Sequence, residues 1–352
     1  MNVVEDLRLC DAFAKVQYGD LEASAELWRN QAFERGQTVW SYSEPAEELA
    51  VVVDGVLEVF LGETMVGEIQ PGTVVGALAT FTRGWRTASV IARDDALLLV
   101  LERPALERAR SEHSAIYDAL LEEAMVACAR RVRAVDKEIA RLAKGTRNAP
   151  ERRKKGTFQR LVARITGAAA GSAPAAKAVL DLLPVLSEAP AHAVEQVARA
   201  LEPVFVEKGE PLFLEAEKGD SMYLLAAGKI EVVRNVRGRR GEVLAELFPG
   251  AVFGTGALLT RERRGASCVA GAETPVWAYE MKRSRYEGLR GEAGRLWREA
   301  LLHALWFELS SADERFAELQ RDLGALEGAK AGSAARRPDR TLGLPRELGD
   351  EA

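Results

Sequence analysis

Two stretches of this sequence place an arginine ten positions after a glycine, a pairing that suits the binding of a small anion. Gly76 precedes Arg86 in VGALATFTRGWRTASV, and Gly254 precedes Arg264 in FGTGALLTRERRGASC. A glycine lets the backbone approach a ligand closely, and a short helix that begins there points free N–H groups at an anion. An arginine across the loop can then hold a phosphate with two parallel hydrogen bonds. Each stretch therefore predicts an anion-binding loop.

We call these stretches the first cassette (residues 75–90) and the second cassette (residues 253–268). Two additional glycines in the second cassette make it more flexible, so ordering it around a ligand would cost more conformational entropy. The three histidines of the chain lie outside any metal or triad motif, and we predict no catalytic and no metal-binding residues. The candidate ligand-binding residues are Gly76, Ala77, Leu78, Arg86, Thr87 and Ala88 in the first cassette, and Gly254, Thr255, Arg264, Gly265 and Ala266 in the second.

The cassettes belong to a repeat that runs through most of the chain. Gly36 and Gly55 match Gly209 and Gly228 at an offset of 173 residues, and the cassettes match at an offset of 178. Short β-branched and apolar segments separated by turn glycines, such as LAVVVDG and VLEVFLG, predict antiparallel strands. We therefore predict a mainly β fold with added helices: two tandem antiparallel β-rolls (jelly rolls), each followed by a long helix.

Each predicted long helix has an apolar seam with heptad spacing. No glycine or proline occurs between Pro104 and Gly145, so we expect one unbroken helix there. The seams can pack on the rolls of the same chain, pair with each other, or pair with another molecule, and the sequence leaves these alternatives open. The seam residues are Leu121, Met125, Cys128, Val132, Val135, Ile139 and Leu142, and then Leu302, Leu305, Leu309, Ala312, Phe316, Leu319, Leu323 and Leu326.

The domain boundaries follow from the repeat and from shifts in composition. A basic run, Arg152–Lys155, lies between the two halves, but it lacks interleaved aromatics and a recognition helix. Nucleic-acid binding is therefore not expected. We predict a first domain over 1–146, a basic and then Ala/Gly-rich linker over 147–176, a second domain over 177–327, and a disordered tail over 328–352.

Composition excludes several other classes of protein. The net charge of −5 argues against a general polyanion binder. No apolar run approaches the roughly 18–20 residues that span a bilayer, so no membrane association is expected. The three cysteines are far apart in the sequence, so no disulfide framework is predicted, and this fits the reducing environment of the cytoplasm.

The cassettes resemble the phosphate-binding cassette of the cyclic-nucleotide-binding domain, which occurs in catabolite-activator-type regulators, protein kinase A regulatory subunits and gated channels. The family pattern F-G-E-L-A-L-L-x-x-x-P-R-T-A-T-V keeps the same ten-residue gap. The resemblance implies cyclic AMP or cyclic GMP as candidate ligands. No helix-turn-helix pattern follows either roll, so no DNA-binding module is expected, and no constellation supports an enzyme.

Both cassettes depart from that pattern at the position of the family glutamate, which accepts a hydrogen bond from the ribose 2′-hydroxyl. This chain has Ala77 and Thr255 at that position. Losing a charge-assisted hydrogen bond costs about 1.5–3 kcal/mol, or one to two powers of ten in affinity. Three interpretations of Arg86 and Arg264 therefore remain open: each is a clamp on a cyclic nucleotide, a clamp on another small anion, or a structural arginine. The first cassette matches the family at more positions and is the better candidate.

The sequence leads to two hypotheses of function. In the first, the chain is a cytoplasmic sensor or regulatory protein. A cyclic nucleotide or related anion at the first cassette would shift the helix that starts at Pro104, whose seam contacts a protein partner or a second copy. In the second, the rolls no longer bind a nucleotide, and the chain is a scaffold that assembles through its helices. A tryptophan near a cassette, Trp40 or Trp85, would stack on a purine or, more commonly, pack in the core.

Overall fold

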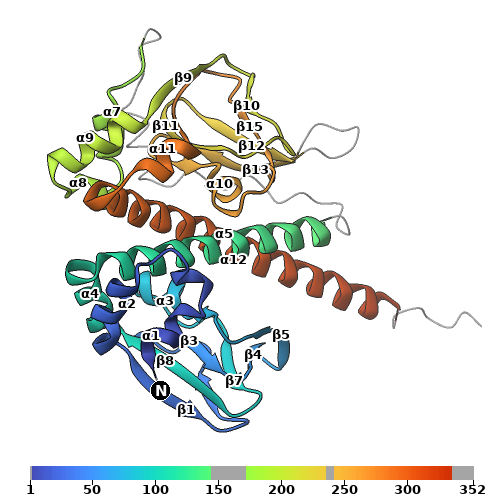
Figure 1. Ribbon diagram of the computed structural model, residues 1–352. Coiled ribbons are helices and arrows are strands. Elements are labelled where there is room, and N and C mark those ends of the chain that lie inside the picture. The colour runs from blue at the N-terminus through green and yellow to red at the C-terminus, as the bar shows by residue number, and fades with distance from the viewer. Residues whose placement is uncertain (1, 144–171, 235–241, 335–352) are drawn as a thin grey trace, which may run out of the picture.

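Two β-rolls lie on opposite sides of a layer formed by two long helices, α5 (Ser114–Ala143) and α12 (Gly291–Ala334) (Figure 1). The computed structural model describes residues 2–143, 172–234 and 242–334. Both halves repeat the same order of strands, so the predicted architecture of two tandem antiparallel rolls, each followed by a long helix, is confirmed. No described helix combines the length and the apolar character needed to cross a membrane.

The first roll consists of two four-stranded antiparallel sheets, with strand orders β1–β8–β3–β6 and β2–β7–β4–β5. Strands β3 and β8 are buried on both faces. Val52 and Leu98 point into the roll, whereas Leu49 and Leu101 face the helices. Burial on two sides explains their nearly continuous apolar sequence. The strands are β1 Arg29–Phe33, β2 Thr38–Trp40, β3 Glu48–Asp54, β4 Leu57–Leu61, β5 Thr64–Ile69, β6 Val74–Val75, β7 Ser89–Ala92 and β8 Ala96–Glu102.

The second roll repeats this topology, with strand orders β14–β11–β16–β9 and β10–β15–β12–β13. The offset between the two halves changes at the connection between β12 and β13, and its tip, residues 235–241, lies outside the described residues. The strands are β9 Glu202–Val206, β10 Pro211–Phe213, β11 Ser221–Ala227, β12 Ile230–Arg234, β13 Glu242–Leu247, β14 Val252–Phe253, β15 Ser267–Ala270 and β16 Val276–Lys282.

Short helices precede each roll, and one short helix lies in each cassette. The preceding helices are α1 Val3–Arg8, α2 Tyr18–Ser24, α7 Ala176–Leu180, α8 Pro184–Ser187 and α9 Ala191–Ala200, with single 3₁₀ turns at Asp11–Phe13 and Ala25–Leu27. The cassette helices are α3 Ala77–Phe81 and α10 Thr255–Thr260.

The helical segment after the first roll is broken, so the prediction of one continuous helix from Pro104 was wrong. Helix α4 (Arg103–Glu112) has Pro104 in its first turn and ends at His113, whose φ of −128° and ψ of 55° are not helical. Helix α5 then starts at Ser114. The turn redirects the chain, because α4 follows directly on strand β8 of the roll whereas α5 must run along α12. No glycine or proline marks the break.

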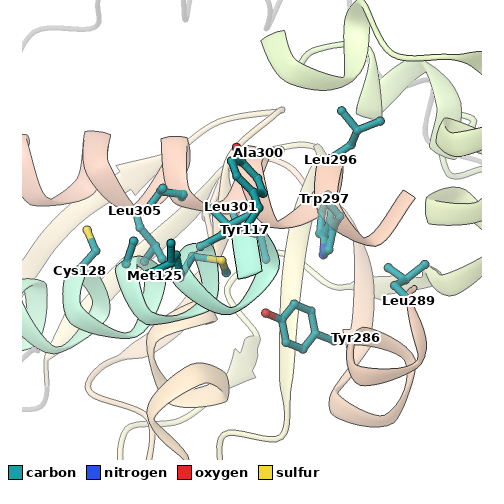
Figure 2. Packing of buried hydrophobic residues seen from close by; sticks show 14 of the residues in the cluster. Tyr117, Met125, Cys128, Tyr286, Leu289, Leu296, Trp297, Ala300, Leu301 and Leu305 are labelled. Carbon is teal, nitrogen blue, oxygen red and sulfur yellow. The ribbon is translucent and has the colours of Figure 1, made fainter. Parts of the chain in front are cut away.

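The two seams pair with each other within the chain, one of the three alternatives left open by the sequence. Met125 and Cys128 of α5 pack with Leu301 and Leu305 of α12 in one apolar core that reaches into both rolls (Figure 2). All four residues are at most 2% exposed. Each such leucine contributes about 2–5 kcal/mol relative to alanine, so this core fixes the two domains to each other. Pairing with another molecule stays a prediction.

A polar contact also links the two domains. Glu299 of α12 accepts hydrogen bonds from Arg110 Nε at 2.8 Å, from Arg110 Nη2 at 2.9 Å and from Tyr117 Oη at 2.8 Å. Beside it, Arg295 Nε lies 3.0 Å from Asp118 Oδ1. Burial, reinforced by Glu299, raises the pKa of Tyr117, so its hydroxyl stays protonated and donates. The negative charge of Glu299 is thereby compensated by Arg110 at the interface between the domains.

The boundary predicted between the second domain and the tail differs from the structure. Helix α12 continues to Ala334, seven residues beyond the expected end at 327. The segment 328–334 contains alanines and one lysine that favour helix, which outweighs its glycines once a long helix already precedes it. The rest of the tail, 335–352, and the basic part of the linker lie outside the described residues.

Candidate functional site

The first cassette begins at the end of β6 and turns through Gly76 into the short helix α3. Gly76 has a φ of 78°, in the left-handed region. A Cβ added there would lie 2.5 Å from Arg86 Nη1 and 3.0 Å from the Trp40 ring. Glycine therefore allows both the turn and the close approach of the arginine. The two residues that were paired by spacing in the sequence meet in the fold.

Arg86 is 5% exposed and lies between the cassette and strand β3. Its Nη2 donates to the backbone carbonyl of Glu48 at 2.7 Å, and its Nη1 approaches the carbonyl of Gly76 at 3.5 Å. The centre of the guanidinium lies 3.7 Å from the centroid of the Trp40 ring, a cation–π distance. The backbone N–H of Arg86 donates to the carbonyl of Glu44 at 2.8 Å. The chain itself therefore holds the arginine in place.

One donor of Arg86 remains unused. The Nε atom is buried and has no hydrogen-bond partner among the described residues. Burial lowers the pKa of Arg86 to about 10, with Glu44 the largest opposing influence. The guanidinium is therefore still charged at neutral pH, and its buried Nε has no acceptor in the part of the chain that the structure describes. Such a group costs free energy that an acceptor oxygen would recover.

The two tryptophans considered near the first cassette have different roles. Trp40 is 5% exposed, packs in the core of the roll beneath Arg86, and donates from Nε1 to Glu48 Oε1 at 3.0 Å. Trp85 is 59% exposed and forms an isolated β-bridge with Pro45. Trp40 is therefore the packing residue, and Trp85 is the aromatic side chain that remains accessible at the cassette.

The second cassette has the same backbone. Gly254 has a φ of 74° and precedes α10, and Arg264 is 4% exposed. Arg264 Nη1 donates to the carbonyl of Gly254 at 2.8 Å, and Nη2 donates to Ser221 Oγ at 3.1 Å. Its Nε is likewise buried without a partner among the described residues. Burial lowers the pKa of Arg264.

The surroundings of Arg264 are more aromatic than those of Arg86. Its guanidinium lies 4.2 Å from the centroid of Phe213 and 5.7 Å from that of Tyr223. Phe213, Tyr223 and Phe253 stack on one another with centroid separations of 5.6 to 6.3 Å. These three rings fill the interior beside the arginine, so the second guanidinium is packed as part of a core.

The remaining candidate residues line the two loops without forming a polar pocket of their own. Ala77 and Thr255, at the family glutamate position, are 6% and 4% exposed. Thr87 Oγ1 accepts a hydrogen bond from Arg131 Nη1 of α5 at 2.6 Å. In the described part of the chain, no three His, Cys, Asp or Glu side chains gather where they could hold a metal ion. The others, Leu78, Ala88, Gly254, Gly265 and Ala266, are half-buried or exposed.

Backbone strain occurs at matching places around both cassettes. The four non-glycine residues with positive φ in the described part of the chain are Ser43, Arg83, Ala216 and Arg261, with values from 51° to 67°. Ser43 and Ala216 differ by the repeat offset of 173, and Arg83 and Arg261 by 178. Each such residue costs about 1–3 kcal/mol, and strain of this kind collects at functional loops. Both copies have therefore kept the same loop conformation.

Sequence reasoning missed the residues that surround the arginines. Glu48, Ser221 and Phe213 come from strands or turns more than 35 positions away, and no local spacing marks them. It also missed Arg131 and Arg133 of α5, which reach the first and the second cassette respectively. The only sign of these two residues in the sequence was their positive charge on the predicted long helix, and the heptad seam directs attention to the apolar face of that helix.

The model of the family described as "Cyclic nucleotide-binding domain" matches residues 30–113 and 203–290, which are the two rolls with their cassettes. The chain is a tandem cyclic-nucleotide-binding-domain protein. The matched ranges contain every candidate ligand-binding residue.

Curated relatives of this tandem cyclic-nucleotide-binding-domain protein include kinases and a bacterial receptor. The cGMP-dependent protein kinase 2 of Rattus norvegicus is 24% identical over 239 residues, which are 68% of this chain and 24% of the kinase. The cyclic AMP receptor protein of Thermus thermophilus is 38% identical over 71 residues, 20% of this chain and 33% of the receptor. The chain thus spans a quarter to a third of the length of these relatives.

Among solved structures, the regulatory domain of Toxoplasma gondii PKA with cAMP is similar at 18% identity and a TM-score of 0.31, over 84% of this chain and 93% of that one. A putative cyclic nucleotide-binding protein from Geobacter metallireducens is similar at 20% identity and a TM-score of 0.32, over 35% of this chain and 93% of that one.

Proposed function

We propose that the chain is a non-enzymatic sensor whose first cassette binds a cyclic nucleotide or a related small anion. The observation that carries this proposal is the buried, charged guanidinium of Arg86, which lies against Gly76 and whose Nε has no hydrogen-bond partner among the described residues. An anion oxygen that reaches it would gain a charge-assisted hydrogen bond and relieve a buried unsatisfied donor. Cyclic AMP and cyclic GMP, which appear in the names of these relatives, are the first ligands to try.

The first cassette is favoured over the second for a physical reason. Arg264 gives both terminal nitrogens to close acceptors, whereas Arg86 has one short contact, to Glu48, and one long one of 3.5 Å, to Gly76. Less hydrogen-bonding free energy is therefore lost when Arg86 exchanges one of its partners within the chain for a ligand. The alanine at position 77 weakens any ribose contact, so we expect affinity about ten- to a hundredfold below that of a cassette with a carboxylate.

The route from the first cassette to the rest of the chain runs through α5. Thr87, next to the clamp arginine, is hydrogen-bonded to Arg131 of that helix. A ligand that reorders the cassette changes this contact and so biases the position of α5. Toward the ends of the described seams, Ile139 of α5 and Phe316 of α12 are only half-buried, and we propose that this part of the helices contacts a protein partner or a second copy of the chain.

Isothermal titration with cyclic AMP, cyclic GMP and cyclic dinucleotides tests the proposal. We expect binding heat with at least one of them, a loss of about a hundredfold in affinity for Arg86→Ala, and little change for the matched Arg264→Ala. Arg86→Lys, which keeps the charge but not the two parallel hydrogen bonds, serves as a second variant if the alanine variant is unstable. Absence of heat at millimolar ligand for all of them would reject the proposal.

One observation supports the scaffold alternative: both arginines already donate hydrogen bonds to backbone carbonyl groups of the chain itself. Under that alternative, Arg86→Ala lowers only the stability of the first roll and leaves any partner bound. Mass measurement of the chain with and without a cyclic nucleotide, together with the titration, separates the two functions.

A further inference from the structure

Glu44 lies in the loop between strands β2 and β3, directly beside the clamp arginine of the first cassette. Its backbone carbonyl accepts a hydrogen bond from Arg86 N at 2.8 Å, and Ser43 N donates to the carbonyl of Arg86 at 2.8 Å. Ser43 has a φ of 63°. Pro45 follows Glu44 and forms an isolated β-bridge with Trp85. A strained residue before it and a proline after it therefore fix the backbone of Glu44 against the cassette.

Two other carboxylates near this arginine are already paired with basic side chains. Glu47 Oε2 lies 3.1 Å from Arg103 Nε. Glu48 Oε2 lies 3.3 Å from Arg29 Nη2. Both carboxylates act to raise the pKa of Arg86, but each has a positive charge beside it that offsets its field at a distance.

The carboxylate of Glu44 has no such partner. Glu44 is half-buried, and its carboxylate takes part in no hydrogen bond and no ion pair within the described residues. Burial lowers the pKa of Arg86, and of the charged groups around it Glu44 opposes this lowering most. The first cassette therefore combines one buried positive charge with one nearby negative charge that nothing else compensates in the described part of the chain.

The second cassette has a glutamate at the equivalent position, but its carboxylate is bound elsewhere. Glu217 matches Glu44 at the repeat offset of 173, and its backbone carbonyl likewise accepts from Arg264 N at 2.8 Å. Its Oε2 accepts a hydrogen bond from Leu214 N at 3.0 Å, which ties the carboxylate to its own loop. Burial lowers the pKa of Arg264, and three other groups oppose this lowering more than Glu217 does. The same residue type thus acts strongly on the arginine only in the first cassette.

An uncompensated carboxylate beside an anion site makes affinity depend on the charge of the ligand. The Coulomb energy of two groups is proportional to the product of their charges, so a doubly charged ligand is repelled twice as strongly as a singly charged one. A phosphate monoester carries close to two negative charges above its second pKa of about 6, whereas a cyclic phosphodiester carries one. When the free energy doubles, the factor in affinity is squared, so about threefold becomes about tenfold.

We propose that Glu44 is a specificity-determining residue of the first cassette, which disfavours a doubly charged phosphate monoester relative to a singly charged phosphodiester. The role of Glu44 rests on the proposed function, because it concerns the ligand of the same site. The clamp arginine attracts both classes of anion, and the carboxylate beside it sets how much negative charge the site accepts. Removal of the carboxylate should therefore strengthen binding, which a merely structural role of Glu44 would not explain.

Isothermal titration at pH 8 with cyclic AMP and with 5′-AMP tests this role, since the two ligands share a base and a sugar and differ in charge. Glu44→Gln keeps the size of the side chain and removes its charge. We expect it to raise the affinity for cyclic AMP about threefold and for 5′-AMP about tenfold, so that the preference for cyclic AMP falls about threefold. In 1 M NaCl this difference should shrink, because the Debye length falls to about 3 Å from about 10 Å at 0.1 M.

Glu217→Gln is the matched control, since it removes the equivalent carboxylate from the second cassette and should leave both affinities unchanged. Glu44→Asp keeps the charge and should keep the preference for cyclic AMP. Glu44→Ala, which also removes the charge, replaces Glu44→Gln if the glutamine variant is unstable.

Two results would overturn this role of Glu44, and they can be told apart. Binding of cyclic AMP with the same preference over 5′-AMP in Glu44→Gln and in the unmodified chain would overturn the role of Glu44 alone. Absence of heat with both nucleotides at millimolar concentration, in the unmodified chain and in Glu44→Gln, would overturn the proposed function and the role of Glu44 with it.

Discussion

The two cassettes have nearly the same backbone but different surroundings. Gly76 and Gly254 have φ values of 78° and 74°, and each is contacted by the guanidinium ten positions later. Arg86, however, rests on one indole ring and a backbone carbonyl, whereas Arg264 is enclosed by stacked rings and a serine hydroxyl. The loop conformation has thus been kept in both copies while the side chains around the charge have diverged.

Loop shape and binding capacity are therefore separable properties of a cassette. A left-handed glycine and an inward arginine suffice to close the loop, because their contacts are backbone hydrogen bonds within the chain. Binding requires in addition that the guanidinium can leave those contacts for a ligand. In the second cassette, two short hydrogen bonds and three packed rings hold the guanidinium, so this arginine is the less available to a ligand. Four experiments test the contrast between the two cassettes.

The largest effect is expected from Phe213→Ala. This ring is 8% exposed and supports Arg264, so its removal should lower the free energy of unfolding by about 3–5 kcal/mol. Guanidinium unfolding followed by circular dichroism measures the loss. Phe205→Ala, on the same roll but 44% exposed, is the control and should cost clearly less. Equal losses for the two variants would show that the second interior is not a packed core.

Restoring the family carboxylate should have opposite effects in the two cassettes. Ala77→Glu offers an acceptor to a ribose hydroxyl and should raise cyclic nucleotide affinity about tenfold or more. Thr255→Glu places a carboxylate at a 4% exposed position beside a filled interior, and we expect it to lower stability by about 3 kcal/mol without creating affinity. Titration and thermal unfolding of both variants decide the matter. Similar behaviour of the two would remove the distinction drawn here.

A smaller effect is expected from Ser221→Ala in the second roll. Its hydroxyl accepts from Arg264 Nη2 at 3.1 Å and contacts Tyr223 Oη at 3.0 Å. Loss of these contacts should lower stability by about 1–2 kcal/mol. Urea unfolding measures the change, and ligand affinity at the first cassette should stay as it was. A weaker affinity instead would mean that the second roll takes part in binding.

The smallest effect concerns pH. Burial lowers the pKa of Arg86 to about 10, so the charged form, which binds an anion, predominates at every pH below that value. Affinity should therefore stay constant within about twofold from pH 6 to 9 and fall only as the pH rises through about 10, where the free protein loses the proton. Titration at a series of pH values checks this. A steep change near neutral pH would point to a different binding group.

Much of the site followed from the sequence because its defining contacts are local. The glycine and the arginine lie ten residues apart on one loop, and the resemblance of this spacing to the family cassette predicted that they meet. The repeat offsets predicted two rolls, since strands bounded by turn glycines occur in the same order twice. The break at His113 was missed because no glycine or proline marks it, and the position of α12 along α5 imposes it.

Two rolls, two closed loops and two apolar seams could be predicted from the sequence alone, because each depends on residues close together in the chain. Three features become apparent only in the folded molecule: the seams pair within one chain, rings from distant strands fill the second interior, and Arg131 and Arg133 reach opposite cassettes. Those outcomes depend on which surfaces meet after folding. Partners separated by tens of residues leave no spacing in the sequence that would identify them.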